Sequence, residues 1–265
     1  MLPAPRRTDL KTLPLGLVSC QVRFHEQAVR LPRNAGFDLQ HLLNEEGGGE
    51  KYVSLVPVRL GSMQVNLSAL GAQTDSSDLR DGWRIATKDG SWTLSIFPNS
   101  AIFESTKYPG WEGYKQRLAT SLRAVAHTLN PEAESRLGLR YVNAFSTQSA
   151  TSPLYWVGKL RSNFLGPLAE PALAGATTNY QQQVVLTFDE ALPEAALRLG
   201  IQPDAVHPNC SAAVLDIDVF RQGIRKFDVP DLLLSVDNFN TLALQLFQQI
   251  LTDEYLSNLE KGGPL

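Results

Sequence analysis

The sequence predicts an α+β fold in which two long helices pack on one face of an antiparallel sheet or sheets. Short segments with alternating apolar residues fill most of the chain, Gly, Asp and Pro separate them, and two amphipathic helical segments interrupt them. The order is strands, long helix, strands, long helix. We therefore expect a single domain over residues 1–265, and the repeated order suggests two intimately packed, pseudo-repeated halves at about 16–130 and 135–261.

The first half is expected to begin with strands. Apolar residues at every second position predict a strand over residues 16–26. A second strand is predicted over 52–60, where Pro57 favours a sheet edge or a bulge, and residues 64–70 can continue it. Three alternating segments joined by short turns predict an antiparallel meander between residues 83 and 105.

A long helix is expected to follow the meander and to end at Asn130 and Pro131. Its apolar residues recur at spacings of three and four positions: Tyr114, Leu118, Leu122, Val125 and Leu129. Ser152 and Pro153 are typical of the start of a shorter helix. The remaining segments are predicted as strands at 136–145, 182–189, 195–202 and 211–221, a loop at 166–178, and a long helix at about 237–260.

Composition restricts the class of protein. The chain has 265 residues, 24 Lys and Arg against 27 Asp and Glu, and a net charge of −3, which argues against a nucleic-acid-binding protein. Two cysteines, Cys20 and Cys210, cannot build a disulfide framework or a cysteine zinc site, so we expect a cytoplasmic protein. No apolar run is long enough for a membrane span, and the stretch after Arg6 and Arg7 is too short for a secretory leader.

Asp216 and Asp218 are the most distinctive pair of acidic residues. They lie at positions i and i+2 of a predicted strand, so both carboxylates point to one face. Pairing with arginine on a neighbouring strand is the favoured interpretation, and Arg140, Arg136 and Asn143 are the candidate partners. A solvated face, Mg²⁺ binding or general acid chemistry are the alternatives.

Other motifs of catalysis are missing from the sequence. It contains no Gly-x-Ser-x-Gly segment and no P-loop, and no two of its four histidines have the i, i+4 spacing of a helical zinc pair. We therefore expect no catalytic residues, no metal site and no cofactor.

Three aromatic residues cluster before the first long helix: Tyr108, Trp111 and Tyr114. Such a density of rings can form a binding platform. The favoured interpretation is a hydrophobic anchor that holds the start of the helix on the sheet. Few basic residues accompany the rings, which argues against nucleic acid as the partner.

Several of these segments occur in one order, and together they resemble a sporadically distributed family of uncharacterised bacterial proteins of about this length. They are Leu13-Pro-Leu15, Tyr108-x-x-Trp111-x-x-Tyr114, Arg136-Leu-Gly-Leu-Arg140-Tyr-Val-Asn143, Leu215-Asp-Ile-Asp218 and Leu251-Thr-Asp-Glu-Tyr255. The resemblance covers nearly the whole chain, and Gly-Leu-Arg-Tyr-Val-Asn is its most specific part. It implies no activity and no catalytic residue. The family's patchy distribution resembles that of mobile-element, toxin–antitoxin and phage-defence genes.

These observations favour a non-catalytic cytoplasmic binding protein: an antitoxin, chaperone-like or sensor component of a mobile or defence locus. Its partner would be another protein encoded nearby, bound by a sheet edge or an apolar groove, with no role for membrane or nucleic acid. Candidate binding residues are Tyr108, Trp111, Tyr114, Arg140, Asn143, Asp216 and Asp218. The alternatives are a metal-dependent enzyme that processes phosphates through Asp216 and Asp218, and a carrier of a small ligand. The oligomeric state stays open.

Overall fold

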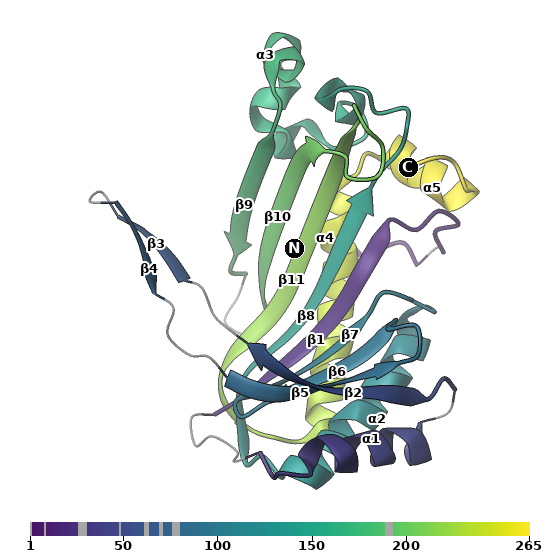
Figure 1. The fold of residues 1–265 in the computed structure, drawn as a ribbon. Helices are drawn as coiled ribbons and strands as arrows, with labels where there is room; N and C mark the ends of the chain where they lie inside the picture. The colour runs from purple at the N-terminus through teal and green to yellow at the C-terminus, as the bar shows by residue number, and fades with distance from the viewer. Residues whose placement is uncertain are drawn as a thin grey trace. The chain divides into compact units, whose positions relative to one another are not determined.

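The computed structural model describes residues 2–7, 9–25, 31–47, 49–60, 64–68, 71–75, 80–188 and 193–265. Within them, nine strands form one antiparallel sheet of order β2-β5-β6-β7-β1-β8-β11-β10-β9, and β3 pairs with β4 (Figure 1). The strands are β1 Leu15–Phe24, β2 Tyr52–Leu60, β3 Gln64–Ser68, β4 Gly71–Asp75, β5 Arg80–Thr87, β6 Trp92–Phe97, β7 Ser100–Ser105, β8 Ala133–Phe145, β9 Tyr180–Leu186, β10 Glu194–Pro203 and β11 Ser211–Lys226.

The expected α+β fold with two long helices on one face of the sheet is wrong. The structure is mostly a single nine-stranded sheet, and the described residues form five α-helices. These are α1 Ala35–Glu46, α2 Trp111–Leu129, α3 Pro171–Ala176, α4 Val229–Ile250 and α5 Asp253–Lys261. Only α2 matches a predicted long helix closely, and α1 occupies a segment for which the sequence analysis predicted no helix.

The predicted C-terminal helix is divided in two. One helix was expected at about residues 237–260, but α4 ends at Ile250 and α5 begins at Asp253. The side chain of Thr252 accepts a hydrogen bond from the backbone N–H of Tyr255 at 3.3 Å, which caps the new helix start. Periodicity alone could not reveal this break, because both helices bury apolar residues at helical spacing: Ala243, Leu246 and Ile250 in α4, and Tyr255, Leu256 and Leu259 in α5.

The segment between β8 and β9 also differs from expectation. In place of a helix starting at Ser152 and Pro153, it forms three short 3₁₀ helices, at Pro153–Trp156, Ser162–Phe164 and Gly166–Ala169. The predicted loop at 166–178 contains the last of these and α3. The ends of three predicted strands, at residues 26, 69–70 and 189, lie outside the described residues.

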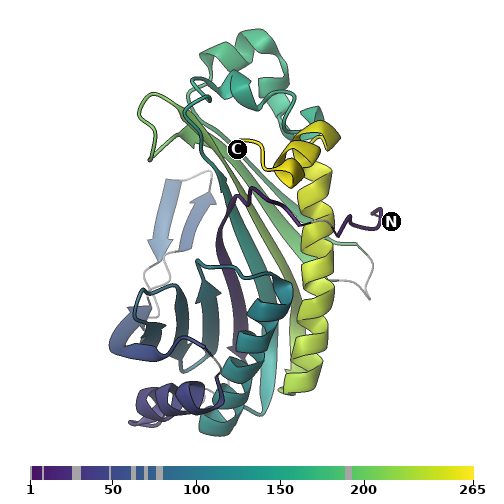
Figure 2. The same ribbon diagram turned by 90° about the vertical axis from the view of Figure 1, so that its right-hand side faces the viewer.

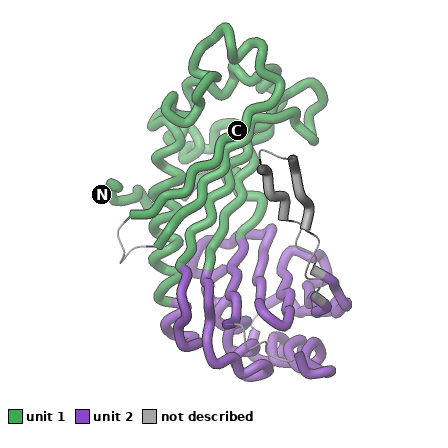
Figure 3. The backbone as a smooth tube through the Cα atoms, turned by 90° about the vertical axis from the view of Figure 1, so that its left-hand side faces the viewer, with its two compact units in different colours: residues 1–18, 138–221, 234–265 green, residues 19–137, 222–233 purple. Residues whose placement is uncertain are grey.

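The chain forms two compact units, and each contains segments that are far apart in sequence (Figure 3). Unit 1 contains residues 1–18, 138–221 and 234–265, and unit 2 contains residues 19–137 and 222–233. The expectation of one domain, or of two packed halves, stays a prediction. None of the helices in the described part of the chain has the length and hydropathy to cross a lipid bilayer.

In unit 1, α4 lies along one face of the sheet (Figure 2). Tyr141 of β8 donates a hydrogen bond from its hydroxyl to Asn240 of α4 at 2.8 Å, and the rings of Phe145 and Phe247 stack with centroids 6.4 Å apart. Because side chains alternate along a strand, Arg140 points to the opposite face of β8. This alternation separates a buried apolar face from a polar face.

In unit 2, the predicted meander is confirmed. β5 pairs with β6 and β6 pairs with β7, both antiparallel, and the first turn closes through a hydrogen bond from Gly90 N to Thr87 O at 3.0 Å. β2 pairs with β5 and ends the sheet, with a register shift between Tyr52 and Ser54. The edge position that Pro57 predicted is therefore confirmed.

Candidate functional site

Asp216 is the centre of an ion-pair cluster in unit 1. Arg140 donates from Nε and Nη2 to its two carboxylate oxygens at 2.7 and 2.8 Å, and Arg198 of β10 donates from Nη1 at 3.0 Å. The Asp216 side chain is 8% exposed, whereas the two arginine side chains are 47% and 44% exposed. The predicted pairing of Arg140 with Asp216 is confirmed, but Arg140 itself is not buried.

This geometry gives Asp216 a structural role. Both of its oxygens already accept hydrogen bonds from guanidinium groups, so a divalent cation would have to displace an arginine. Asp218 lies on the same face of β11 and is half-buried. Among the described residues, no group of three or more His, Cys, Asp and Glu has the arrangement of a metal site.

Asn143 belongs to a different environment from Arg140. It is buried, and its amide donates to the backbone carbonyl of Leu215 at 3.3 Å. The two residues are three positions apart in β8, so their side chains leave opposite faces of the strand. The structure therefore does not bring Arg140 and Asn143 together into one site.

Tyr114 anchors α2 to the sheet of unit 2. Its side chain is fully buried, and its hydroxyl donates to the carbonyl of Phe103 at 3.1 Å. The rings of Tyr108, Trp111 and Trp92 lie within 6.1–6.3 Å of the Tyr114 ring, centroid to centroid. Burial raises the pKa of the Tyr114 hydroxyl well above its usual range. This arrangement matches the hydrophobic anchor rather than an exposed platform.

Among the strands that the structure describes, β9 is the outermost strand of the sheet in unit 1. It pairs with β10 from Tyr180 to Leu186 and is the last strand in the sheet order. Its sequence, Tyr-Gln-Gln-Gln-Val-Val-Leu, contains no charged residue and no proline, and Val185 is 55% exposed. Natural proteins usually block such an edge with Lys, Pro or a bulge, because its backbone groups are free to pair with another strand.

β2, the other edge strand, carries these protective features. It contains Pro57 and a register irregularity near Ser54, and Arg59 pairs with Asp81 of β5 at 2.6 Å. β9 contains no proline and no charged residue, so it lacks the features that protect β2 against pairing with another strand.

A groove in unit 1 runs beside β9. It has a volume of about 670 Å³ and is lined by Val184 and Leu186 of β9, Leu197 of β10 and Leu246 of α4, with Arg161 among its polar residues. The groove lies on the side of β9 to which Val184 and Leu186 point. An added strand at this edge would direct alternate side chains toward it.

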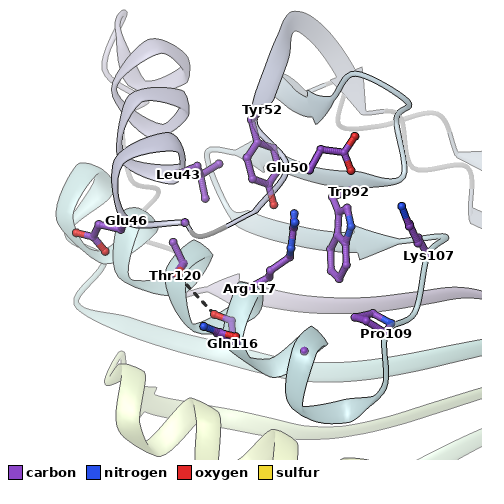
Figure 4. A pocket seen from close by; sticks show the side chains of 12 residues that line it. Leu43, Glu46, Glu50, Tyr52, Trp92, Lys107, Pro109, Gln116, Arg117 and Thr120 are labelled. Carbon is purple, nitrogen blue, oxygen red and sulfur yellow. Dashed lines mark hydrogen bonds between the residues drawn. The ribbon is translucent and has the colours of Figure 1, made fainter.

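Unit 2 contains a pocket of about 360 Å³, shown in Figure 4. Its walls come from α1, α2, β2, β6 and the segment that precedes α2, and they include Tyr52, Trp92, Lys107 and Arg117. Arg117 is not part of the apolar stripe that predicts its helix, and no local sequence pattern links it to Trp92, which lies in β6. The sequence also contains no sign that β9 lies at the edge of the sheet, because strand order depends on pairing between distant segments. The lack of charged residues in β9 is visible in the sequence.

No model of a known protein family and no curated protein matches this chain. The resemblance to a sporadically distributed bacterial family therefore stays a prediction from its motifs.

Proposed function

We propose that this protein is a non-catalytic binding protein that holds an extended segment of another protein along β9. The observation that carries the proposal is the unprotected edge of β9, which ends the sheet without charge or proline. In strand addition, backbone hydrogen bonds supply affinity and pockets for alternate side chains supply specificity.

The groove beside β9 indicates what the partner segment contains. Val184, Leu186 and Leu246 offer an apolar surface to every second side chain of an added strand. The other side chains would lie beside Gln181 and Gln183, which are exposed and uncharged. The partner segment is therefore an extended stretch with apolar residues at alternate positions and polar residues between them.

The partner is expected to be encoded nearby, in keeping with an antitoxin, chaperone-like or sensor component of a mobile or defence locus. We expect binding to take place in the cytoplasm, because Cys20 and Cys210 are both free thiols. The metal-dependent alternative gains no support from Asp216, whose two oxygens are held by arginines.

The test is a pull-down of the tagged 265-residue chain from the native host, with neighbouring genes intact and quantitative mass spectrometry as readout. Val185→Lys places a charge on β9, and Val53→Lys makes the same change on β2, where the side chain is 60% exposed. Both positions face solvent, so both variants should fold like the parent chain, as circular dichroism can verify.

We expect one protein to be recovered in stoichiometric amount with the parent chain and with Val53→Lys, and at least tenfold less with Val185→Lys. Hydrogen exchange of the β9 amides should slow when that partner is added. Equal recovery by all three chains would contradict the proposal. Recovery of a second, differently tagged copy of this chain in place of another protein would also overturn it.

A further inference from the structure

The pocket in unit 2 holds a guanidinium in a fixed position. The Arg117 Cζ atom lies 4.5 Å from the centroid of the Trp92 ring, and Tyr52 lines the same pocket. Trp92 and Tyr52 are themselves buried. In Figure 4, the Arg117 side chain extends from α2 between these two rings. The guanidinium is therefore held in place by residues that cannot move easily.

The guanidinium of Arg117 has N–H groups that can donate hydrogen bonds to a ligand. A guanidinium carries five N–H donors around its edge, whereas its contact with the Trp92 ring is made by its face. Among the described residues, no carboxylate lies within 4.0 Å of Arg117, whereas Arg140, Arg161 and Arg198 all have such a partner. A planar guanidinium fork binds a carboxylate through two parallel hydrogen bonds. The side chain is thus suited to an anion that enters the pocket.

The other charged residues of the pocket indicate how many negative charges the anion carries. Lys107 adds a second cation, and its backbone is fixed because Ser105 both accepts from Lys107 N at 3.0 Å and donates to Lys107 O at 2.7 Å. Glu46 has its own partner, since it lies 3.8 Å from Arg123. Glu50 remains as an acidic residue of the lining and disfavours a ligand with two negative charges.

Size and lining then restrict the rest of the ligand. A volume of about 360 Å³ is small for a ligand site, and sites for small molecules usually combine apolar walls with few polar groups. Leu43 and Pro109 supply such walls beside the ring of Trp92. We propose that this pocket binds a small organic carboxylate of single negative charge, with Arg117 holding the carboxylate and Leu43 and Pro109 contacting its apolar part.

Benzoate is the probe, and ligand-observed NMR titration of the full chain is the measurement. Benzamide has the same shape without the charge, and phenyl phosphate carries a second charge on the same ring. Arg117→Gln should weaken benzoate binding by about tenfold or more, because it removes a charge-assisted pair of hydrogen bonds. Lys107→Gln should weaken it less, and Glu50→Gln should strengthen it. Lys88→Gln, which removes an exposed cation from the turn after β5, is the matched control.

Benzoate should bind the parent chain and Lys88→Gln with equal affinity, and it should bind both more tightly than benzamide or phenyl phosphate does. It is overturned if benzoate does not bind, if benzamide or phenyl phosphate binds as tightly, or if Arg117→Gln leaves the affinity unchanged. If Arg117→Gln lowers the melting temperature sharply, its benzoate affinity is not informative, and the affinity of Lys107→Gln becomes the test of the proposal. Lys107 is exposed, so its replacement should not disturb the fold. An unchanged benzoate affinity in Lys107→Gln counts against the proposal.

Discussion

Arg198 lies directly opposite Asp216 in the pairing of β10 with β11, and its Nη1 donates to the Asp216 carboxylate at 3.0 Å. Arg140 of β8 donates hydrogen bonds to the same carboxylate. The buried Asp216 therefore connects β11 to both of its neighbours in the sheet, β10 and β8. Opposite charges across a strand pair stabilise its register.

Removing both arginines should destabilise the protein more than removing the carboxylate. Arg140→Ala with Arg198→Ala leaves a buried charge without compensation, which costs about 3–5 kcal/mol. Asp216→Ala leaves two half-exposed arginines that water can solvate, so about 1–3 kcal/mol is expected. Urea unfolding measures these differences. Arg225→Ala, at an exposed position of β11, is the control and should change the stability by less than about 0.5 kcal/mol.

The ion-pair interpretation fails if the double arginine variant is as stable as the parent chain. In that case Asp216 would gain its stability from contacts other than the two guanidiniums.

The same cluster shows how far the sequence could lead. The alternation in β11 correctly placed Asp216 and Asp218 on one face, and Arg140 was among the candidate partners. Neither the choice of Asp216 nor the role of Arg198 could be predicted, because both depend on the register of strands that are distant in sequence. The meander of β5, β6 and β7 was predictable because its turns are local.

Tyr114 should stabilise the protein mainly through its ring. Tyr114→Phe removes one buried hydrogen bond, to the Phe103 carbonyl, and should cost about 1 kcal/mol. Tyr114→Ala also leaves a cavity among Trp92, Phe103 and Trp111 and should cost about 3–5 kcal/mol. Chemical denaturation of the two variants measures both values. A small, equal effect of both would contradict the role of Tyr114 as an anchor of α2.

Asp89 should make the stability depend on pH in the acid range. Its carboxylate accepts hydrogen bonds from the backbone N–H of Ser91 and from the hydroxyls of Ser91 and Thr87, which together lower its pKa to about 2. The pKa of an aspartate in the unfolded chain is about 3.9. The stabilisation is therefore complete above that pH and is lost as the pH falls toward 2.

Asp89→Asn keeps an acceptor oxygen in the turn but cannot titrate. The midpoint of urea unfolding should fall less between pH 5 and pH 2 in this variant than in the parent chain. Asp228→Asn serves as a control, because it replaces a carboxylate at the start of α4 and leaves the turn unchanged. An identical pH profile for Asp89→Asn and the parent chain would show that this turn contributes nothing to acid unfolding.

The two cysteines should differ sharply in reactivity. Cys20 is 2% exposed, and burial raises the pKa of its thiol to about 12, so almost no thiolate forms near pH 8. Cys210 is partly exposed in the turn before β11, with its thiol directed to the carbonyl of Gln148 at 3.5 Å. A thiol-exchange reagent should therefore label one cysteine in the folded chain and both in denaturant. Cys210→Ser should abolish labelling of the folded chain, and rapid labelling of Cys20 in that variant would mean that the core around β1 opens readily.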